Sequence, residues 1–258
     1  MPDEDIGDRW PRPSHDLIVH RDADAVAEDV AARLIAELAA LQVADKDSPV
    51  HICTTGGSTA QTLWPALVGR PEIGDVDWTG VHVWFSDERF VPSGHPERND
   101  LTLLACADDL GLPVANIHSI PGPDRSMDVA SAAWQYAVEL ESWSPVDSPH
   151  EVPLFRVSLL GIGPDGHVAS LFPGDRTDES AAVVAVVDAP KPPPQRVTFT
   201  RTTLRTCDQL WFVAFGEAKA EVVGRALTDD DPIRTPAAGV SGRDRTLWFV
   251  DEALARRL

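Results

Sequence analysis

Short apolar segments alternate with longer amphipathic segments along almost the whole chain, and this alternation constrains the fold more than any other feature of the sequence. Several of the apolar segments are nearly continuous in apolar character, as in strands that are buried on both faces. They occupy residues 17–19, 50–53, 81–85, 117–119, 155–160, 210–214 and 246–250. The sequence therefore predicts an α/β fold, with a mostly parallel, Rossmann-like sheet and helices on both of its faces.

The segments between these strands have the period of a helix. In the first of them, which starts near Asp22, Val26, Val30, Leu34 and Leu38 recur every fourth residue, and the aspartate is a candidate N-cap. Further helices are expected over residues 58–68, 99–109, 126–143 and 217–227, with a short one after the last strand. Residues 197–200 alternate in polarity, as in an edge or antiparallel strand.

The length and composition suit one domain. The chain has 258 residues, 43% of them apolar, which is enough for a single α/β domain over residues 15–258. Residues 1–14 carry Pro2, Pro11 and Pro13 among charged side chains and are expected to form a flexible N-terminal arm. The proline-rich stretch at 190–194 is too short to separate two domains.

The charge balance excludes several classes of partner. Lys and Arg total 22 against 41 Asp and Glu, a net charge of −19, so nucleic acid and anionic membrane surfaces are not expected partners. The longest apolar run, residues 181–187, is far shorter than the roughly 18 residues of a membrane span, and the first residues lack a signal-peptide pattern. The expected location is the cytoplasm. Three cysteines without C-x-x-C spacing predict neither a disulfide framework nor a thiolate metal site.

Glycine and hydroxyl residues follow the strand at 50–53. In the run Thr54-Thr55-Gly56-Gly57-Ser58-Thr59, two glycines allow a sharp turn and a close approach of the backbone to a ligand. The N–H groups that begin the next helix, with the hydroxyls of Ser58 and Thr59, suit a phosphate. A glycine turn capped by Ser58 explains the same residues without a ligand.

Two further segments place charged residues at strand ends. Ser86-Asp87-Glu88-Arg89 follows a strand at the position where α/β sheets bind ligands. Arg89 either stabilises negative charge on a substrate oxygen or pairs with one of its acidic neighbours in a structural salt bridge. Lys219, in Gly216-Glu217-Ala218-Lys219, is expected in the first turn of a helix, where a cation is unfavourable unless an anion shares the site. It is either a phosphate ligand or an ordinary solvated lysine.

The most informative segment covers residues 160–174 and reads LGIGPDGHVASLFPG. Three glycines within six residues, directly after a buried strand, predict an unusual backbone path that ends at His167. A neutral imidazole can accept a proton near neutral pH, so this histidine is the candidate general base. Asp165 lies two residues before it and is a candidate to orient the ring or to order a water molecule.

In this order, the segments resemble those of the 6-phosphogluconolactonase family, which is part of the superfamily that also contains the glucosamine-6-phosphate deaminases. The resemblance covers about residues 50–240, and the glycine-rich stretch that contains His167 is its most specific part. The other matching segments are GGST at 56–59, WFSDERFVP at 84–92, PERN at 96–99, KPPPQR at 191–196 and GEAKA at 216–220.

The resemblance implies the fold of the sugar-phosphate isomerases and deaminases. It also implies hydrolysis of 6-phospho-D-glucono-1,5-lactone in the oxidative pentose phosphate pathway, without a metal or an organic cofactor. His167 is then the base that activates water, Asp165 positions it, and Arg89 stabilises the carbonyl oxygen. The implied phosphate ligands are Gly57, Ser58, Thr59 and Lys219, with Lys191 or Arg196 adding charge. The implied partner is the sugar-phosphate lactone alone, bound to a monomer or a weak homodimer.

The sequence departs from the family pattern in places, and two other functions stay open. Residues 199–205 replace a run that the lactonases have, so no role is assigned to them, and Thr55 and Ala60 differ from the usual residues of the first motif. A glucosamine-6-phosphate deaminase is the nearest alternative, but those enzymes have a glutamate in the turn after the histidine, where this chain has Ala169-Ser170-Leu171-Phe172-Pro173. A non-catalytic sugar-phosphate sensor is the second alternative.

Overall fold

The computed structural model describes residues 15–258 except 147, 149, 178 and 230. The expected N-terminal arm, residues 1–14, lies outside the described residues. No helix among the described residues combines the length and the apolar character needed to cross a membrane.

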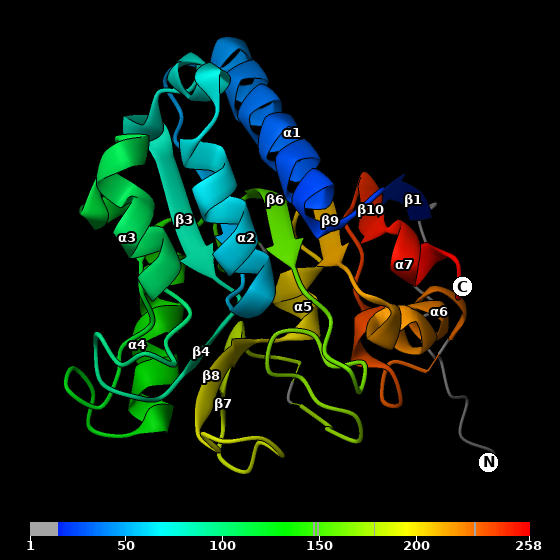
Figure 1. Ribbon diagram of the computed structural model, residues 1–258. Coiled ribbons are helices and arrows are strands. Elements are labelled where there is room, and N and C mark those ends of the chain that lie inside the picture. The colour runs from blue at the N-terminus through cyan, green and yellow to red at the C-terminus, as the bar shows by residue number, and fades with distance from the viewer. Residues whose placement is uncertain (1–14, 147, 149, 178, 230) are drawn as a thin grey trace.

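A seven-stranded sheet forms the centre of the molecule (Figure 1). Its strand order is β1-β10-β9-β6-β2-β3-β5, and every neighbouring pair is parallel. The bounds are β1 His15–His20, β2 Val50–Thr54, β3 Val81–Phe85, β5 Ile117–His118, β6 Phe155–Leu160, β9 Gln209–Ala214 and β10 Arg245–Asp251. The predicted parallel sheet is therefore confirmed, and each of its strands contains one of the apolar segments except β5, which ends one residue before the end of 117–119.

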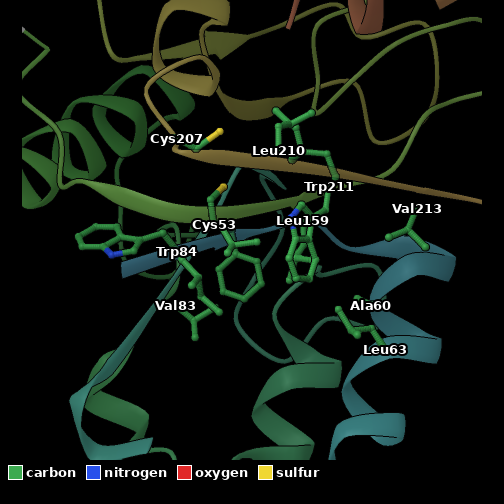
Figure 2. Close-up of a cluster of buried hydrophobic side chains, with 14 of the residues drawn as sticks. Cys53, Ala60, Leu63, Val83, Trp84, Leu159, Cys207, Leu210, Trp211 and Val213 are labelled. Atoms are coloured by element: carbon green, nitrogen blue, oxygen red, sulfur yellow. The ribbon is translucent and has the colours of Figure 1, made fainter. Parts of the chain in front are cut away.

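The strands at the centre of this sheet are buried on both faces. Every residue of β2, β3 and β9 is buried, which explains why these segments lack the polar alternation of a half-exposed strand. In Figure 2, Leu210 and Trp211 point to opposite sides of β9, and Ala60 and Leu63 approach from the side of Trp211. The core thus has two layers, one on each side of the sheet.

Two of the longer helices begin at aspartates that cap their first turn. Asp22 accepts the Ala25 N–H at 2.8 Å, and Asp128 accepts the Ser131 N–H at 2.7 Å. The helices are α1 Ala23–Ala44, α2 Gly57–Val68, α3 Leu101–Leu110, α4 Val129–Ser142, α5 Arg201–Leu204, α6 Ala220–Thr228 and α7 Glu252–Ala255. Short 3-10 turns occupy Pro71–Asp75, Trp78–Gly80, Val114–Asn116, Glu217–Lys219 and Pro236–Gly239.

A second, smaller sheet lies beyond the carboxyl ends of the central strands (Figure 1). It is antiparallel, with the order β4-β8-β7, and consists of β4 Asp87–Arg89, β8 Arg196–Phe199 and β7 Val183–Val186. The antiparallel strand expected at 197–200 is confirmed as β8. The sequence did not predict β4 or β7. This sheet carries Arg89 and Arg196, which face each other in register across the β4–β8 pair.

Three histidines form a buried cluster on one face of the sheet. His82 and His118 lie 2.9 Å apart between Nδ1 and Nε2, and the indole N–H of Trp84 donates to Nδ1 of His51 at 3.1 Å. Burial lowers the pKa of His51 to about 3, and the neighbouring histidines lower it further in the same direction. The pKa of His82 falls to about 4 for the same reasons. Both rings are therefore neutral at pH 7.

Candidate active site

One cleft collects the segments that follow four neighbouring strands. It lies where β2, β3, β6 and β9 end, and it has a volume of about 210 Å³. That volume is below the roughly 300–1,000 Å³ of pockets for drug-sized ligands, so the cleft suits a small ligand. Its lining includes seven of the nine predicted site residues, namely Gly57, Ser58, Thr59, Arg89, His167, Arg196 and Lys219. The remaining two, Asp165 and Lys191, lie behind His167.

The glycine turn after β2 opens the cleft at the start of helix α2. Gly57 has φ +66°, in the left-handed region that favours glycine, and the N-cap Gly56 provides no side-chain hydrogen bond to the helix. The Ser58 cap suggested by the sequence is therefore not formed, because Ser58 lies inside the helix. The first N–H groups of α2 are left for a ligand at the positive end of the helix dipole.

The glycine-rich loop after β6 folds tightly around His167. The Gly163 N–H donates to the His167 carbonyl at 2.9 Å, and the Gly166 N–H donates to the Gly163 carbonyl at 3.0 Å. Gly166 has φ +96°. A Cβ atom on Gly163 would lie 1.9 Å from Cε1 of His167, so the imidazole occupies the space that a side chain would need. Only glycine therefore fits at position 163 when the ring lies here.

Asp165 and Lys191 support the histidine from outside the cleft. The Asp165 carboxylate hydrogen-bonds Nδ1 of His167. Lys191 reaches the same carboxylate, with Nζ 3.3 Å from Oδ2. Burial acts to raise the pKa of Asp165, but the hydrogen bond to His167 and the charges of His167 and Lys191 outweigh it and lower the pKa. Asp165 is therefore an anion that fixes the ring.

The environment keeps His167 unprotonated. Burial lowers its pKa below the ordinary 6.5, and this outweighs the opposing effects of the Asp165 hydrogen bond and charge. Its ring also packs on Phe172, with centroids 4.8 Å apart. A neutral imidazole held by a carboxylate can accept a proton at its other nitrogen.

Arg89 extends along one wall of the cleft. Its Nη1 donates to the Glu97 carbonyl at 2.5 Å, and among the described residues it forms no ion pair with Asp87 or Glu88. The salt-bridge alternative considered from the sequence is therefore not what the structure shows. The guanidinium is therefore available to pair with an anionic ligand.

The other two lining cations differ in how they are held. Arg196 is buried, donates to the Pro193 and Lys191 carbonyls at 3.2 and 3.1 Å, and lies over the Phe172 ring. Lys219 ends a 3-10 turn and is the N-cap of α6, rather than lying in the first turn of a longer helix. Burial lowers its pKa, and no carboxylate in the described part of the chain pairs with it.

Asp87 and Asn99 line the cleft but were not predicted as site residues. Asp87 is 4% exposed and accepts the Ser170 hydroxyl at 2.7 Å. Asn99 donates from Nδ2 to the Asp87 carbonyl at 2.8 Å, and its Oδ1 lies where a Cβ on Gly56 would be. Both belong to segments that the family resemblance had marked, but nothing in their spacing shows that they meet. Within the described ranges, no three His, Cys, Asp or Glu side chains are placed to hold a metal ion.

Comparison with known proteins places the chain in a family. The family model described as glucosamine-6-phosphate isomerases/6-phosphogluconolactonase matches residues 21–248. The chain belongs to this family. A protein called 6-phosphogluconolactonase from Streptomyces coelicolor is 42% identical over 94% of each chain. Another of that name, from Homo sapiens, is 36% identical over 88% of each chain.

Solved structures agree with this assignment. The crystal structure of a protein called devB has a TM-score of 0.80 and 29% identity, over 95% of this chain and 100% of that one. The 6-phosphogluconolactonase of Trypanosoma brucei has a TM-score of 0.79 over 96% of this chain and 100% of that one, and at 24% identity it shows the shared fold alone. The expected fold of the sugar-phosphate isomerases and deaminases is confirmed.

Proposed function

We propose that this chain is a 6-phosphogluconolactonase, which hydrolyses 6-phospho-D-glucono-1,5-lactone to 6-phospho-D-gluconate in the oxidative pentose phosphate pathway. The relatives that carry this name span nearly the whole chain. The observation that supports it best is that the base candidate His167 and the open N-terminus of α2 line the same small cleft. An ester and a phosphate on one six-carbon molecule need these two features together.

The phosphate end of the substrate binds at the start of α2. The N–H groups after Gly57, with the Ser58 and Thr59 hydroxyls, form an anion site at the positive end of the helix dipole. Lys219 supplies the opposite charge. Because this cation is partly buried without an anionic partner among the described residues, the bound phosphate also stabilises its charged form. Binding of the phosphate, remote from the reacting carbon, holds the lactone next to the base.

At the other end, His167 activates water. Because the Asp165 carboxylate accepts the proton of Nδ1, the free lone pair is on Nε2, which takes a proton from water as the oxygen attacks C1 of the lactone. Attack turns the carbonyl oxygen into an oxyanion, which the Arg89 guanidinium stabilises. The C1–O5 bond then breaks, and the protonated His167 returns its proton to the ring oxygen.

Arg196 and Lys191 have supporting roles in this scheme. Arg196 lines the cleft and adds positive charge for the substrate, whereas Lys191 acts through Asp165, which it contacts. Residues 199–205 receive no role. We place the enzyme in the cytoplasm, as a monomer or a weak homodimer, and size-exclusion chromatography with light scattering checks the oligomeric state.

The decisive experiment follows the loss of freshly made 6-phosphogluconolactone against its spontaneous hydrolysis. The wild-type protein is expected to accelerate the loss, and His167→Ala to reduce kcat by at least about 10²-fold, the typical worth of a general base. Binding of 6-phosphogluconate, measured by calorimetry, should stay within a few-fold because the phosphate site is untouched. Ammonia release from glucosamine 6-phosphate by the wild type would instead favour the deaminase, and full turnover by the variant would refute the assignment of the base.

A further inference from the structure

Directly behind Arg89, the carboxylate of Glu88 joins two segments of the active-site wall. Glu88 is 1% exposed. Its oxygens accept the backbone N–H of Arg89 at 2.8 Å and that of Asn99 at 2.9 Å, and a third N–H, from Asp100, lies at 3.3 Å. The Glu88 carboxylate therefore joins strand β4 to the loop at 97–100, in addition to the Asn99–Asp87 and Arg89–Glu97 hydrogen bonds between the same segments.

The charge of Glu88 is not needed to balance its basic neighbour. Arg98 lies 3.6 Å from Glu88, but its guanidinium is already committed to Asp100, with contacts of 3.0 Å from Nε and 2.6 Å from Nη2. Arg98 thus pairs most closely with Asp100, and Glu88 is a second, more distant buried anion beside it. Burial raises its pKa to about 7 in spite of Arg98 and the backbone donors. A glutamine would remove this buried charge, but its amide N–H groups would face backbone donors that the carboxylate accepts.

The two segments that Glu88 joins both reach the cleft. Arg89 projects from β4, and its guanidinium rests on the Glu97 carbonyl of the loop. Asn99, from the same loop, hydrogen-bonds Asp87 and packs against Gly56 of the phosphate turn. The Glu88 carboxylate therefore fixes both the origin of the Arg89 side chain and the carbonyl on which its charged end rests.

We propose that Glu88 is a positioning residue whose ionised carboxylate holds Arg89 and the loop at 97–100 in the reactive arrangement. The proposal rests on the lactonase function proposed above. Protonation places a hydrogen on one carboxylate oxygen, among N–H groups that need acceptors. The hydrogen bonds from Glu88 to β4 and to the loop at 97–100 therefore weaken. Four of the charged and titratable groups around Glu88 come from its own strand and loop, and they are Asp87, Arg89, Arg98 and Asp100. The elements packed against them add Arg196 of β8 and Tyr136 of α4.

The test replaces Glu88 by glutamine and compares it with Glu141→Gln. Glu141 is exposed near the end of α4 and has no part in the site, so this control makes the same charge change away from β4 and the loop. For Glu88→Gln we expect kcat to fall about tenfold, less than the loss that a displacement of a reacting group by about 1 Å causes, while KM changes less than about threefold. Glu141→Gln should match the wild type.

The pH profile separates positioning from packing. Wild-type kcat should fall on the acid side in two ionisations, one near pH 7 from Glu88 and a lower one from His167. In Glu88→Gln only the lower one should remain. A variant with wild-type kcat, or one whose kcat falls equally at every pH, would overturn the proposal.

Thermal unfolding gives a readout that does not need activity. Because the folded-state pKa of Glu88 is raised above the ordinary 4.5, its ionisation removes stability as the pH rises from about 4.5 to 7, and the loss persists above pH 7. The melting temperature of the wild type should therefore fall between about pH 4.5 and 7, and Glu88→Gln should lack this part of the fall; a variant that keeps it would count against the proposal.

If the wild type hydrolyses no lactone, the proposed function fails, yet this comparison still tests Glu88. If the glutamine variant does not fold, Glu88→Asp, which keeps the charge but withdraws the oxygens, must show the lowered kcat.

Discussion

Replacing Gly163 by alanine tests how the glycine-rich loop delivers the base. The new Cβ would lie 1.9 Å from Cε1 and 2.0 Å from Nδ1 of His167, whereas ordinary contacts begin near 3.4 Å. The ring and the loop must therefore separate by about 1.5 Å, the difference between 3.4 and 1.9 Å. A misplacement of about 1 Å can reduce a rate 10²-fold. We expect kcat to fall about 10²-fold, which corresponds to about 2.7 kcal/mol in the barrier.

The assay is the same lactone hydrolysis, with stability measured beside it. Overpacking of this kind also destabilises a fold by about 1–3 kcal/mol, so unfolding in urea should show a loss in that range. Gly74→Ala is the matched control, because no atom lies within 4 Å of the Cβ position at that glycine and its φ is not positive. It should leave both kcat and stability close to the wild type.

A double variant isolates the contact itself. In a His167→Ala background the ring is gone, so Gly163→Ala should cause little further loss of rate or of stability. If the two substitutions act independently, the clash with the imidazole is not the cause. A folded Gly163→Ala enzyme with kcat within threefold of the wild type would refute the reasoning about the ring altogether.

Two further predictions concern the phosphate site and the buried histidines. Lys219→Met should weaken binding of 6-phosphogluconate about 10–100-fold, the effect of losing one hydrogen bond to a charged group. Lys46→Met, in the exposed bend after α1, is the control, and competitive inhibition measures both. Because the folded-state pKa of His51 is about 3, its unfolded form binds a proton below pH 6.5 and the folded form does not, so stability falls as the pH is lowered. At pH 5 the stability lost in this way is about 2 kcal/mol. Urea unfolding should show that His51→Gln no longer has this loss between pH 7 and pH 5, whereas the control His95→Gln still has it.

The order of the elements could be predicted from the sequence because each depends on local pattern. Fully buried strands such as β3 are recognisable by their continuous apolar character, and Asp22 marks the start of α1 by its capping chemistry. Strand β4, by contrast, is the polar run Asp87–Arg89, so it has no hydrophobic period to detect. It becomes a strand only because β8 pairs with it, and that pairing joins segments far apart in the sequence.

The same distinction between local pattern and tertiary contact applies to the residues of the site. His167 could be predicted because glycines close to it in sequence mark an unusual turn. Asn99 could not, since its contacts with Asp87 and Gly56 depend on how three loops meet. Lys191, in the proline-rich stretch, likewise pairs with Asp165 over 26 positions, 191 less 165. Sequence pattern therefore identifies residue types at strand ends, and the tertiary fold decides which of them contact one another.

The cleft has a charge opposite in sign to that of the chain, and this local charge decides how an anion binds. Its lining contains the cations Arg89, Arg196 and Lys219 and the anion Asp87, a balance of 3 − 1 = +2 with His167 neutral, against −19 overall. Charges more than about 8 Å away are largely screened at physiological ionic strength. The acidic surface therefore slows the approach of a dianion at low salt more than it weakens the bound state. Binding strength depends on the few cations inside the cleft, and above all on Lys219, which has no protein anion beside it in the described chain.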